Sequence, residues 1–403
     1  MNETDSSNRG AWRAVAMTID ASKYPDDIRL HQNVLGFGYG GTTMVRAPDV
    51  ATGHSTPSEF VYRTNTGAYL AVWRQDSDIL APCTLWGSRS MNGWDPKPNA
   101  ADLLKWPTSR GAPWSTMWLW QDENGDGAMT SSEFVDLAAG TQSRRSFRSV
   151  GKLAPAEDGH IWHRVESSES GISRHYLYMW EQSAVSAHGC PVYNATPTVN
   201  ITWPPAPFNE TDSIRGCGDC GRLDYDSVTD TMWVADFTSA RPQSAPRVGI
   251  GEEVGSVACR YDHFMQDITA KKQPAPALCF DLPYWVNSTE YSPHGSNVWA
   301  NMTHALSTAG NCVFIGMLAE PGVTVPPVNY TTGGALIYVY SGKTGKLLGE
   351  LNPDDKAYIG SSGWMDIADG TSAFMRGDGS VLVFAEDVFF EKMVTYLLPP
   401  GVC

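Results

Sequence analysis

Short apolar segments recur along the whole chain and are separated by Gly, Asp, Asn and Pro. Segments of this length between turn residues are typical of β-strands, and almost no stretch shows a helical period over a useful length. The pattern predicts strands over Trp12–Ile19, Glu59–Tyr62, Tyr69–Trp73, Ile161–Val165, His175–Trp180, Thr231–Phe237, Ser256–Tyr261, Ala277–Trp285, Cys312–Leu318, Ala335–Tyr340, Ser380–Phe384 and Met393–Leu398.

Turn residues between neighbouring segments predict hairpins. Ala335–Tyr340 is followed by the turn Ser341–Gly345 and by Lys346–Leu351, and the turn Gly377–Gly379 precedes Ser380–Phe384. Many short antiparallel strands must avoid exposed sheet edges, and a ring of four-stranded blades does so with local connections. We therefore expect an all-β fold, a β-propeller of roughly six to eight blades, with an array of β-sandwiches as the alternative.

No domain boundary is evident, so we expect residues 1–403 to form one propeller domain, as a whole protein or as a fragment of a larger extracellular one. The 15 tryptophans of the chain fit either the cores of large blades or surfaces that stack on sugars. Because Trp is usually buried over most of its area, we expect blade packing.

One segment matches the twelve-residue calcium loop D-x-[DN]-x-[DN]-G-x5-E at every fixed position. Calcium binds six to eight oxygen atoms, and the glycine of the loop, here Gly127, allows the sharp turn that the backbone needs. The sequence therefore predicts a Ca²⁺ site. Its expected ligands are side-chain oxygens and one carbonyl, from Asp122, Asn124, Asp126, Ala128 (carbonyl), Thr130 and Glu133.

The residues beside this loop differ from those of a sensor EF-hand, in which helices flank the loop. Trp114–Trp120 alternates as a strand does, and only Ser131–Ala139 could form a short helix. The chain contains no second complete loop of this kind. We therefore expect an EF-hand-like loop inserted between elements of the propeller, where the ion acts as a structural clamp.

Charge and hydropathy exclude two classes of partner. The net charge is −15, with 29 Lys and Arg against 44 Asp and Glu, so nucleic acid and anionic membranes would be repelled. No apolar stretch reaches the 18 or so residues that span a bilayer. The polar start of the chain is no signal peptide, so residue 1 is expected to be a mature terminus or a cut.

Cysteines and glycosylation sequons indicate a secreted, extracellular glycoprotein. The disulfide candidates are Cys83, Cys190, Cys217, Cys220, Cys259, Cys279, Cys312 and Cys403. Cys259 and Cys279 lie on neighbouring predicted strands and could bridge, and Cys217 and Cys220 fit a local disulfide or two separate pairs better than a redox dithiol or half a zinc site. The seven Asn-x-Ser/Thr sequons begin at Asn2, Asn194, Asn200, Asn209, Asn287, Asn301 and Asn329.

Several segments resemble secreted bacterial propellers related to the NHL-repeat type. They are Leu223–Asp236, Ala258–Asp262, Phe280–Tyr284, Leu306–Ile315, Ser362–Ile367 and Val381–Glu386, and the run Trp118–Gly127 is similar to the calcium loop that such proteins often carry after a strand. The resemblance implies the fold more than an activity, since the family is largely uncharacterised. The sequons and extra cysteines depart from the family and suggest a eukaryotic relative.

No catalytic motif of the common hydrolase, metalloprotease or nucleotide-binding types is present, so no catalytic residue is assigned. His160 and His163 stand three apart in a predicted strand and point to opposite faces, which prevents them from sharing a metal. The acid pairs Asp26-Asp27 and Asp354-Asp355 adjoin proline in turn-like sequence, where we expect solvated carboxylates.

Three functions remain open. The first is a binding or structural module that presents its loops to a polysaccharide or to a matrix or surface protein, alone or as a subunit of an assembly. The alternative is a carbohydrate-active enzyme, a polysaccharide lyase or glycoside hydrolase, with acids from several blades around the central channel. A calcium-dependent hydrolase would need a second metal site in that channel. Among these, we expect the binding module.

Overall fold

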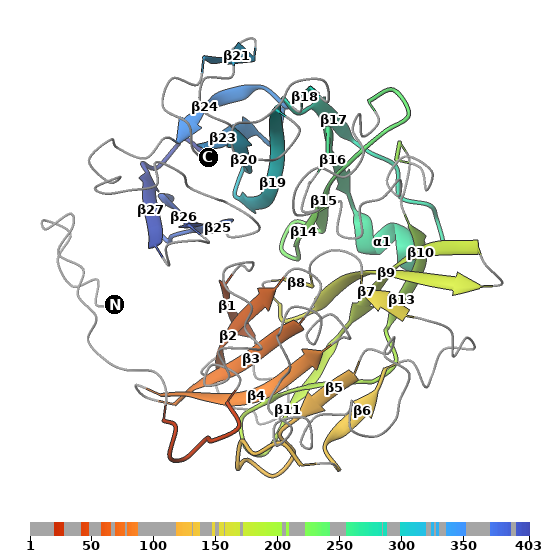
Figure 1. The fold of residues 1–403 in the computed structure, drawn as a ribbon, viewed down its shortest axis with the longest axis vertical. Helices are drawn as coiled ribbons and strands as arrows, with labels where there is room; N and C mark the ends of the chain where they lie inside the picture. The colour runs from red at the N-terminus through yellow and green to blue at the C-terminus, as the bar shows by residue number, and fades with distance from the viewer. Residues whose placement is uncertain are drawn as a thin grey trace, which may run out of the picture.

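Antiparallel β-sheets account for nearly all of the secondary structure (Figure 1). The structure is a computed structural model, and it describes residues 20–27, 42–47, 58–65, 69–76, 79–87, 118–130, 132–137, 147–149, 153–156, 158–169, 172–203, 207–208, 222–241, 255–283, 285–287, 299–319, 324–325, 328–329, 336–351, 371–387 and 392–403.

Five sheets follow one another in chain order around a common centre, as the blades of a β-propeller do (Figure 1). The first blade has the order β1 (Thr42–Ala47), β2 (Ser58–Asn65), β3 (Tyr69–Asp76), β4 (Ile79–Gly87), β5 (Trp118–Gln121) and β6 (Phe134–Asp136). The second has the order β13 (Val199–Trp203), β10 (Ile172–Trp180), β9 (Ile161–Glu169) and β7 (Phe147–Ser149), and β9 also pairs with β8 (Ala154–Pro155).

The remaining three blades come from the second half of the chain. The third is β14 (Arg222–Asp226), β15 (Thr231–Asp236), β16 (Val257–Asp262) and β17 (Leu278–Asp281). The fourth is β18 (Trp285–Asn287), β19 (Trp299–Ala309), β20 (Cys312–Ala319), β23 (Leu336–Ser341) and β24 (Leu347–Leu351). The fifth is β25 (Thr371–Met375), β26 (Val381–Asp387) and β27 (Lys392–Leu398).

Two short hairpins and one helix complete the described elements. The hairpins are β11 (Gln182–Val185) with β12 (Pro191–Tyr193), and β21 (Thr324–Val325) with β22 (Val328–Asn329). The helix α1 (Phe264–Thr269) follows the end of β16, where the apolar pattern had predicted no helix. No helix within the described ranges is long and apolar enough to cross a membrane.

The apolar pattern predicted the strands well. Every predicted segment in the described residues contains a strand, although Ala277–Trp285 divides into β17 and β18, and Trp12–Ile19 lies outside those residues. Both expected hairpins, β23 with β24 and β25 with β26, are confirmed. The described residues form five blades, so the expected six to eight blades are not confirmed.

Successive residues of a central strand pack against different neighbouring blades. In β15, Met232 and Val234 belong to the apolar cluster shared with the second blade, whereas Trp233 and Ala235 belong to the cluster shared with the fourth. This follows from the period of two, which sends alternate side chains to opposite faces of a sheet. Because both faces are buried, such a strand is apolar throughout.

The tryptophans whose side chains the structure describes fill apolar clusters of the blades, as expected. Trp86, Trp120, Trp162 and Trp180 are among the largest side chains that are fully buried. Trp162 packs with Phe264 of α1 at a distance of 5.6 Å between ring centroids, so the helix contributes to the cluster between the second and third blades. Blade packing thus accounts for these rings, which leaves no need for them to form a sugar-stacking surface.

A buried ion pair joins the second and third blades. Arg164 of β9 and Asp236 of β15 are at most 3% exposed, and their Nη1 and Oδ2 atoms lie 3.2 Å apart. Burial raises the pKa of the Asp236 carboxyl, while the charge of Arg164 and a hydrogen bond from the Phe237 amide act in the opposite direction. The pair therefore links the two blades, and its burial carries a desolvation cost.

Three disulfides are formed among the described cysteines. Cys259–Cys279 joins facing residues of β16 and β17, a bridge that the sequence allowed. Cys83–Cys190 joins β4 to the β11–β12 hairpin, and Cys312–Cys403 joins β20 to the end of the chain. Cys217 and Cys220 lie outside the described residues.

The disulfides should stabilise the fold according to the length of chain that each encloses. Cys312–Cys403 spans 91 residues and Cys259–Cys279 spans 20. We expect Cys312→Ala/Cys403→Ala to lower the free energy of unfolding by about 4 to 5 kcal/mol, and Cys259→Ala/Cys279→Ala by about 3 kcal/mol, because the longer loop gains more entropy in the unfolded chain. Urea unfolding measures both, and the reverse order would contradict this account.

His163 should make the fold sensitive to acid. It is fully buried beside Trp180, and burial lowers its pKa to about 3. Between pH 6.5 and 3 the unfolded chain therefore binds a proton that the folded chain does not, so stability falls as pH falls. At pH 4.5 the loss from this residue is on the order of 3 kcal/mol relative to pH 7.5.

The measurement is urea unfolding of the wild type and of His163→Gln at pH 7.5 and pH 4.5. The variant should lose less stability on acidification, because Gln takes up no proton. The exposed His188 supplies the matched control, His188→Gln, which should follow the wild type. Equal acid sensitivity of the wild type and His163→Gln would show that His163 is not the group responsible.

Candidate functional site

The predicted calcium loop connects two strands of the first blade. It follows β5 (Trp118–Gln121), which confirms the expected strand before it as far as Trp118; residues 114–117 lie outside the described residues. The short helix expected within Ser131–Ala139 is wrong, because β6 (Phe134–Asp136) pairs with β5 there. The segment is therefore a strand–loop–strand unit, and pairing with β5 outweighs any helical tendency of so short a segment.

Three of the six expected ligands come together in this loop. Carboxylate oxygens of Asp122, Asp126 and Glu133 lie within 4.8 Å of one another, with Asp122 and Glu133 buried and Asp126 exposed. The Asn124 side chain accepts a hydrogen bond from the Asp126 amide at 2.9 Å, and the Thr130 hydroxyl donates to Glu133 at 2.8 Å. An all-oxygen donor set with three carboxylates fits a hard cation such as Ca²⁺.

The loop backbone turns around Asp122. Its two carboxylate oxygens accept hydrogen bonds from the amides of Gly125 and Gly127, at 2.8 and 3.2 Å, and both glycines have positive φ. Burial raises the pKa of Asp122 and the neighbouring acids Glu133 and Asp126 raise it further, against the effect of the two amides. The loop thus gathers negative charge that a bound cation would neutralise.

Residues 20–27 pack against the loop from a distant part of the sequence. The Tyr24 ring lies where a side chain at position 127 would stand, and Asp26 Oδ2 accepts a hydrogen bond from the Met129 amide at 3.2 Å. Asp26 and Asp27 are 6% and 0% exposed, so the expectation that this pair is solvated is wrong. The contact with the loop, which is not local in sequence, explains the difference.

The β11–β12 hairpin holds the other side of the loop. Gln121 accepts a hydrogen bond from the Tyr193 amide at 2.7 Å and donates one to the Tyr193 carbonyl at 3.1 Å. The Asp122 amide donates to the carbonyl of Cys83, which is bonded to Cys190 of the same hairpin. Both ends of the predicted metal site are therefore fixed to rigid elements.

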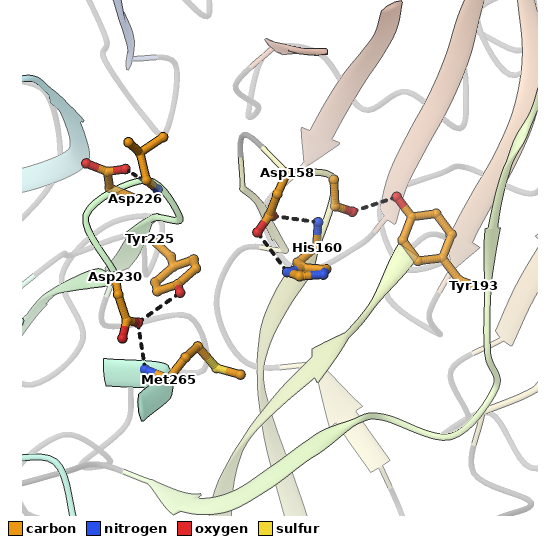
Figure 2. A network of polar contacts seen from close by, with 9 residues as sticks. Asp158, His160, Tyr193, Tyr225, Asp226, Asp230 and Met265 are labelled. Carbon is orange, nitrogen blue, oxygen red and sulfur yellow. Dashed lines mark hydrogen bonds and ion pairs between the residues drawn. The ribbon is translucent and has the colours of Figure 1, made fainter. Parts of the chain in front are cut away.

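Polar groups also gather where the second and third blades face each other (Figure 2). In the turn between β8 and β9, His160 Nδ1 lies 2.9 Å from Asp158 Oδ2. In the third blade, Asp230 Oδ1 accepts hydrogen bonds from the Tyr225 hydroxyl at 3.0 Å and from the Met265 amide at 2.7 Å. His163 is fully buried, whereas His160 is partly exposed.

A chain of phenols continues this network into the core. The Tyr193 hydroxyl donates to the Gly159 carbonyl at 2.8 Å, and it lies 2.8 Å from the Tyr62 hydroxyl. Burial raises the pKa of both tyrosines, so both hydroxyls stay protonated at neutral pH. The two hydroxyls connect the first blade to the second through the β11–β12 hairpin, so their role is structural.

A cavity of about 280 Å³ lies between the third and fourth blades. Its walls are the β14–β15 turn with Thr231 and Trp233, the end of β16 with Asp262, the β19–β20 turn, and Gly342. No short motif marks these residues, because they come from four segments that are far apart in the sequence. For this reason the sequence alone gives no sign of the cavity.

The expected glycosylation sites are divided between described and undescribed residues. Asn194 and Asn200 are exposed, as a glycan requires. Asn287, Asn301 and Asn329 lie in β18, β19 and β22, and Asn2 and Asn209 lie outside the described residues.

No family model matches the chain, and no curated protein matches it. Among solved structures, AofleA from Arthrobotrys oligospora has a TM-score of 0.32 and 9% identity, over 91% of this chain and 85% of that one. The alpha-L-arabinanase of Cellvibrio cellulosa has a TM-score of 0.33 and 9% identity, over 90% of this chain and 91% of that one. At these TM-scores the likenesses carry no inference, and the resemblance to NHL-type propellers stays a prediction.

The loop should tolerate no side chain at position 127. Gly127 has a φ of 66°, and a Cβ there would collide with the Tyr24 ring. We expect Gly127→Ala to lower the free energy of unfolding by about 2 kcal/mol or more, because the strain of a left-handed residue adds to the collision. Urea unfolding measures this.

The matched control is Gly377→Ala, in an exposed turn where a Cβ would meet nothing within 4 Å. It should leave stability within about 0.5 kcal/mol of the wild type. Equal stabilities of the two variants would mean that residues 20–27 do not pack on the loop as described.

Proposed function

We propose that this chain is an extracellular, calcium-stabilised β-propeller that acts as a binding or structural module of a cell surface or matrix. The observation that carries the proposal is the convergence of Asp122, Asp126 and Glu133 in a loop that is anchored at both ends to one blade. Three carboxylates in so small a space repel one another unless a cation lies between them. A structural ion in a rigid propeller fits a protein that presents a fixed surface to a partner.

The Ca²⁺ ion would be held by oxygens of Asp122, Asn124, Asp126, Ala128, Thr130 and Glu133. When bound, it neutralises the carboxylates and orders the loop. The loop belongs to the first blade, whereas the cavity lies between the third and fourth blades. This separation favours a clamp on a connection over an ion that takes part in chemistry at the cavity.

The proposed location rests on cysteine and asparagine chemistry. Three disulfides among the described residues fit an oxidising compartment. Two sequon asparagines, Asn194 and Asn200, are exposed and accessible to a glycosyltransferase. Both features support a secreted glycoprotein.

A carbohydrate-active enzyme is the second candidate, because Asp226 and Asp262 line the same cavity. Glycoside hydrolysis needs one carboxyl group that donates a proton and another that acts as nucleophile or base. Here Asp262 is paired with Arg260, and Asp226 accepts hydrogen bonds from the Val228 and Thr229 amides and the Thr229 hydroxyl. Both carboxylates are thus engaged with groups of the protein itself, so neither is assigned the role of acid or base, and the binding module remains the first proposal.

Chelation should lower the melting temperature of the wild-type protein. With calcium at about 100 times its dissociation constant, the ion adds about 2.7 kcal/mol to the stability of the folded state. The double variant Asp122→Asn/Glu133→Gln removes two carboxylates and should show no calcium binding by isothermal titration. Its melting temperature should not respond to EDTA.

The matched control is Glu123→Gln, which changes an exposed acid of the same loop outside the expected ligand set. This variant should bind calcium as the wild type does. Calcium uptake that persists in the double variant, or a wild-type melting temperature that ignores EDTA, would refute the calcium site.

A further inference from the structure

The cavity between the third and fourth blades is small and polar. Its volume of about 280 Å³ lies near the lower end of small-molecule sites, which start at about 300 Å³. It opens among the turns that follow β14, β16, β19 and β23, at one end of both blades. Turns on a rigid scaffold are the usual position of binding residues in a propeller.

The polar groups of the cavity suit a ligand with many hydroxyl groups. Thr229, Thr231 and Thr308 contribute hydroxyl oxygens as acceptors, because their protons are donated within the protein, to Asp226, the Thr229 carbonyl and Asp224. Asn311 and His263 are exposed at the rim, and within the described part of the chain their side chains have no hydrogen-bond partner. These two side chains are therefore available to a ligand.

The charges of the cavity disfavour an anion. The Arg260 guanidinium binds Asp262 through Nε and Nη2, at 2.8 and 3.0 Å, and donates through Nη1 to the Gly342 carbonyl. The Asp262 carboxylate therefore neutralises the charge of this cation, which leaves little net attraction for a phosphate or carboxylate. Asp226 adds a further negative charge to the same wall.

Trp233 supplies an apolar wall. It is 5% exposed and packs edge-on against Phe280, so its ring is fixed before any ligand binds. A Cβ at Gly342 would lie 3.4 Å from the Trp233 ring and 3.0 Å from the Asn311 carbonyl. The glycine therefore keeps open the space between the ring and the β19–β20 turn.

We infer that this cavity binds one neutral saccharide residue. The Asn311 amide and the hydroxyl and carboxylate oxygens of the wall can pair with sugar hydroxyls, while the small part of the fixed indole that lines the cavity contacts an apolar C–H group of the ring. The inference rests on the proposed binding function and gives it a site and a ligand class. Because a single sugar has few atoms, the expected dissociation constant is about millimolar.

The experiment is saturation-transfer NMR on the full chain with D-glucose, D-galactose, D-mannose and L-arabinose as neutral probes and D-glucuronate as the anionic probe. At least one neutral sugar should bind. If D-glucose binds, D-glucuronate should bind more weakly than D-glucose. Asn311→Ala should raise the dissociation constant about fivefold, the effect of one lost hydrogen bond.

Two further variants, a second change at the cavity rim and a control outside the cavity, separate loss of binding from loss of folding. His263 has a φ of 56°, which Asn adopts more readily than Ala, so His263→Asn is the second variant of the cavity rim. Lys343→Ala changes an exposed residue of the turn beside Gly342, outside the cavity walls, and should leave the dissociation constant unchanged. Circular dichroism checks that each variant is folded.

Each result has one meaning. No binding of any neutral sugar by the wild type overturns the inference, and so does sugar binding that both Asn311→Ala and His263→Asn retain in full. A glycan array on the wild type and Asn311→Ala separates the two proposals. Array binding that survives in Asn311→Ala means that the module binds glycans elsewhere, so only the cavity assignment fails.

Discussion

Burial of both faces of every inner blade is the constraint on which the rest of this structure depends. A sheet with two apolar faces is stable only between two neighbours, and in β15 the alternation of Met232 and Val234 with Trp233 and Ala235 supplies the contacts to both. The blades therefore stabilise one another. Trp233 also belongs to this packing, so the core and the wall of the proposed sugar site are one unit.

Polar groups gather in the turns because the spaces between blades are filled by apolar side chains. Arg164 and Asp236 are an exception, and they are buried as an ion pair. The predicted metal loop follows the same rule, since it connects β5 to β6, and the β11–β12 hairpin and residues 20–27 hold it in place. The polar and acidic side chains thus lie mainly in the loops, whereas the packed blades provide a rigid scaffold.

The strands and the convergence of acids in the predicted metal loop could be anticipated because their signals are local. A run of apolar residues between turn residues is visible within ten positions, and the segments that became β9, β15 and β20 were all found in this way. The acids from Asp122 to Glu133 lie within twelve consecutive residues, so their convergence follows from the turn at Gly127. A bridge between Cys259 and Cys279 could be considered from the sequence for the same reason, since the two residues lie on neighbouring strands.

The sequence by itself determined the all-β class, most strand positions and the acidic residues of the predicted metal loop. Only the tertiary structure decided the number of described blades, the burial of Asp26 and Asp27, and the pairing of Cys83 with Cys190 and of Cys312 with Cys403. It also decided that a strand, not a helix, follows the loop. The physical reason is distance along the chain. Each of these features, like the cavity, depends on which distant segments pack side by side. That packing is determined by the fold as a whole.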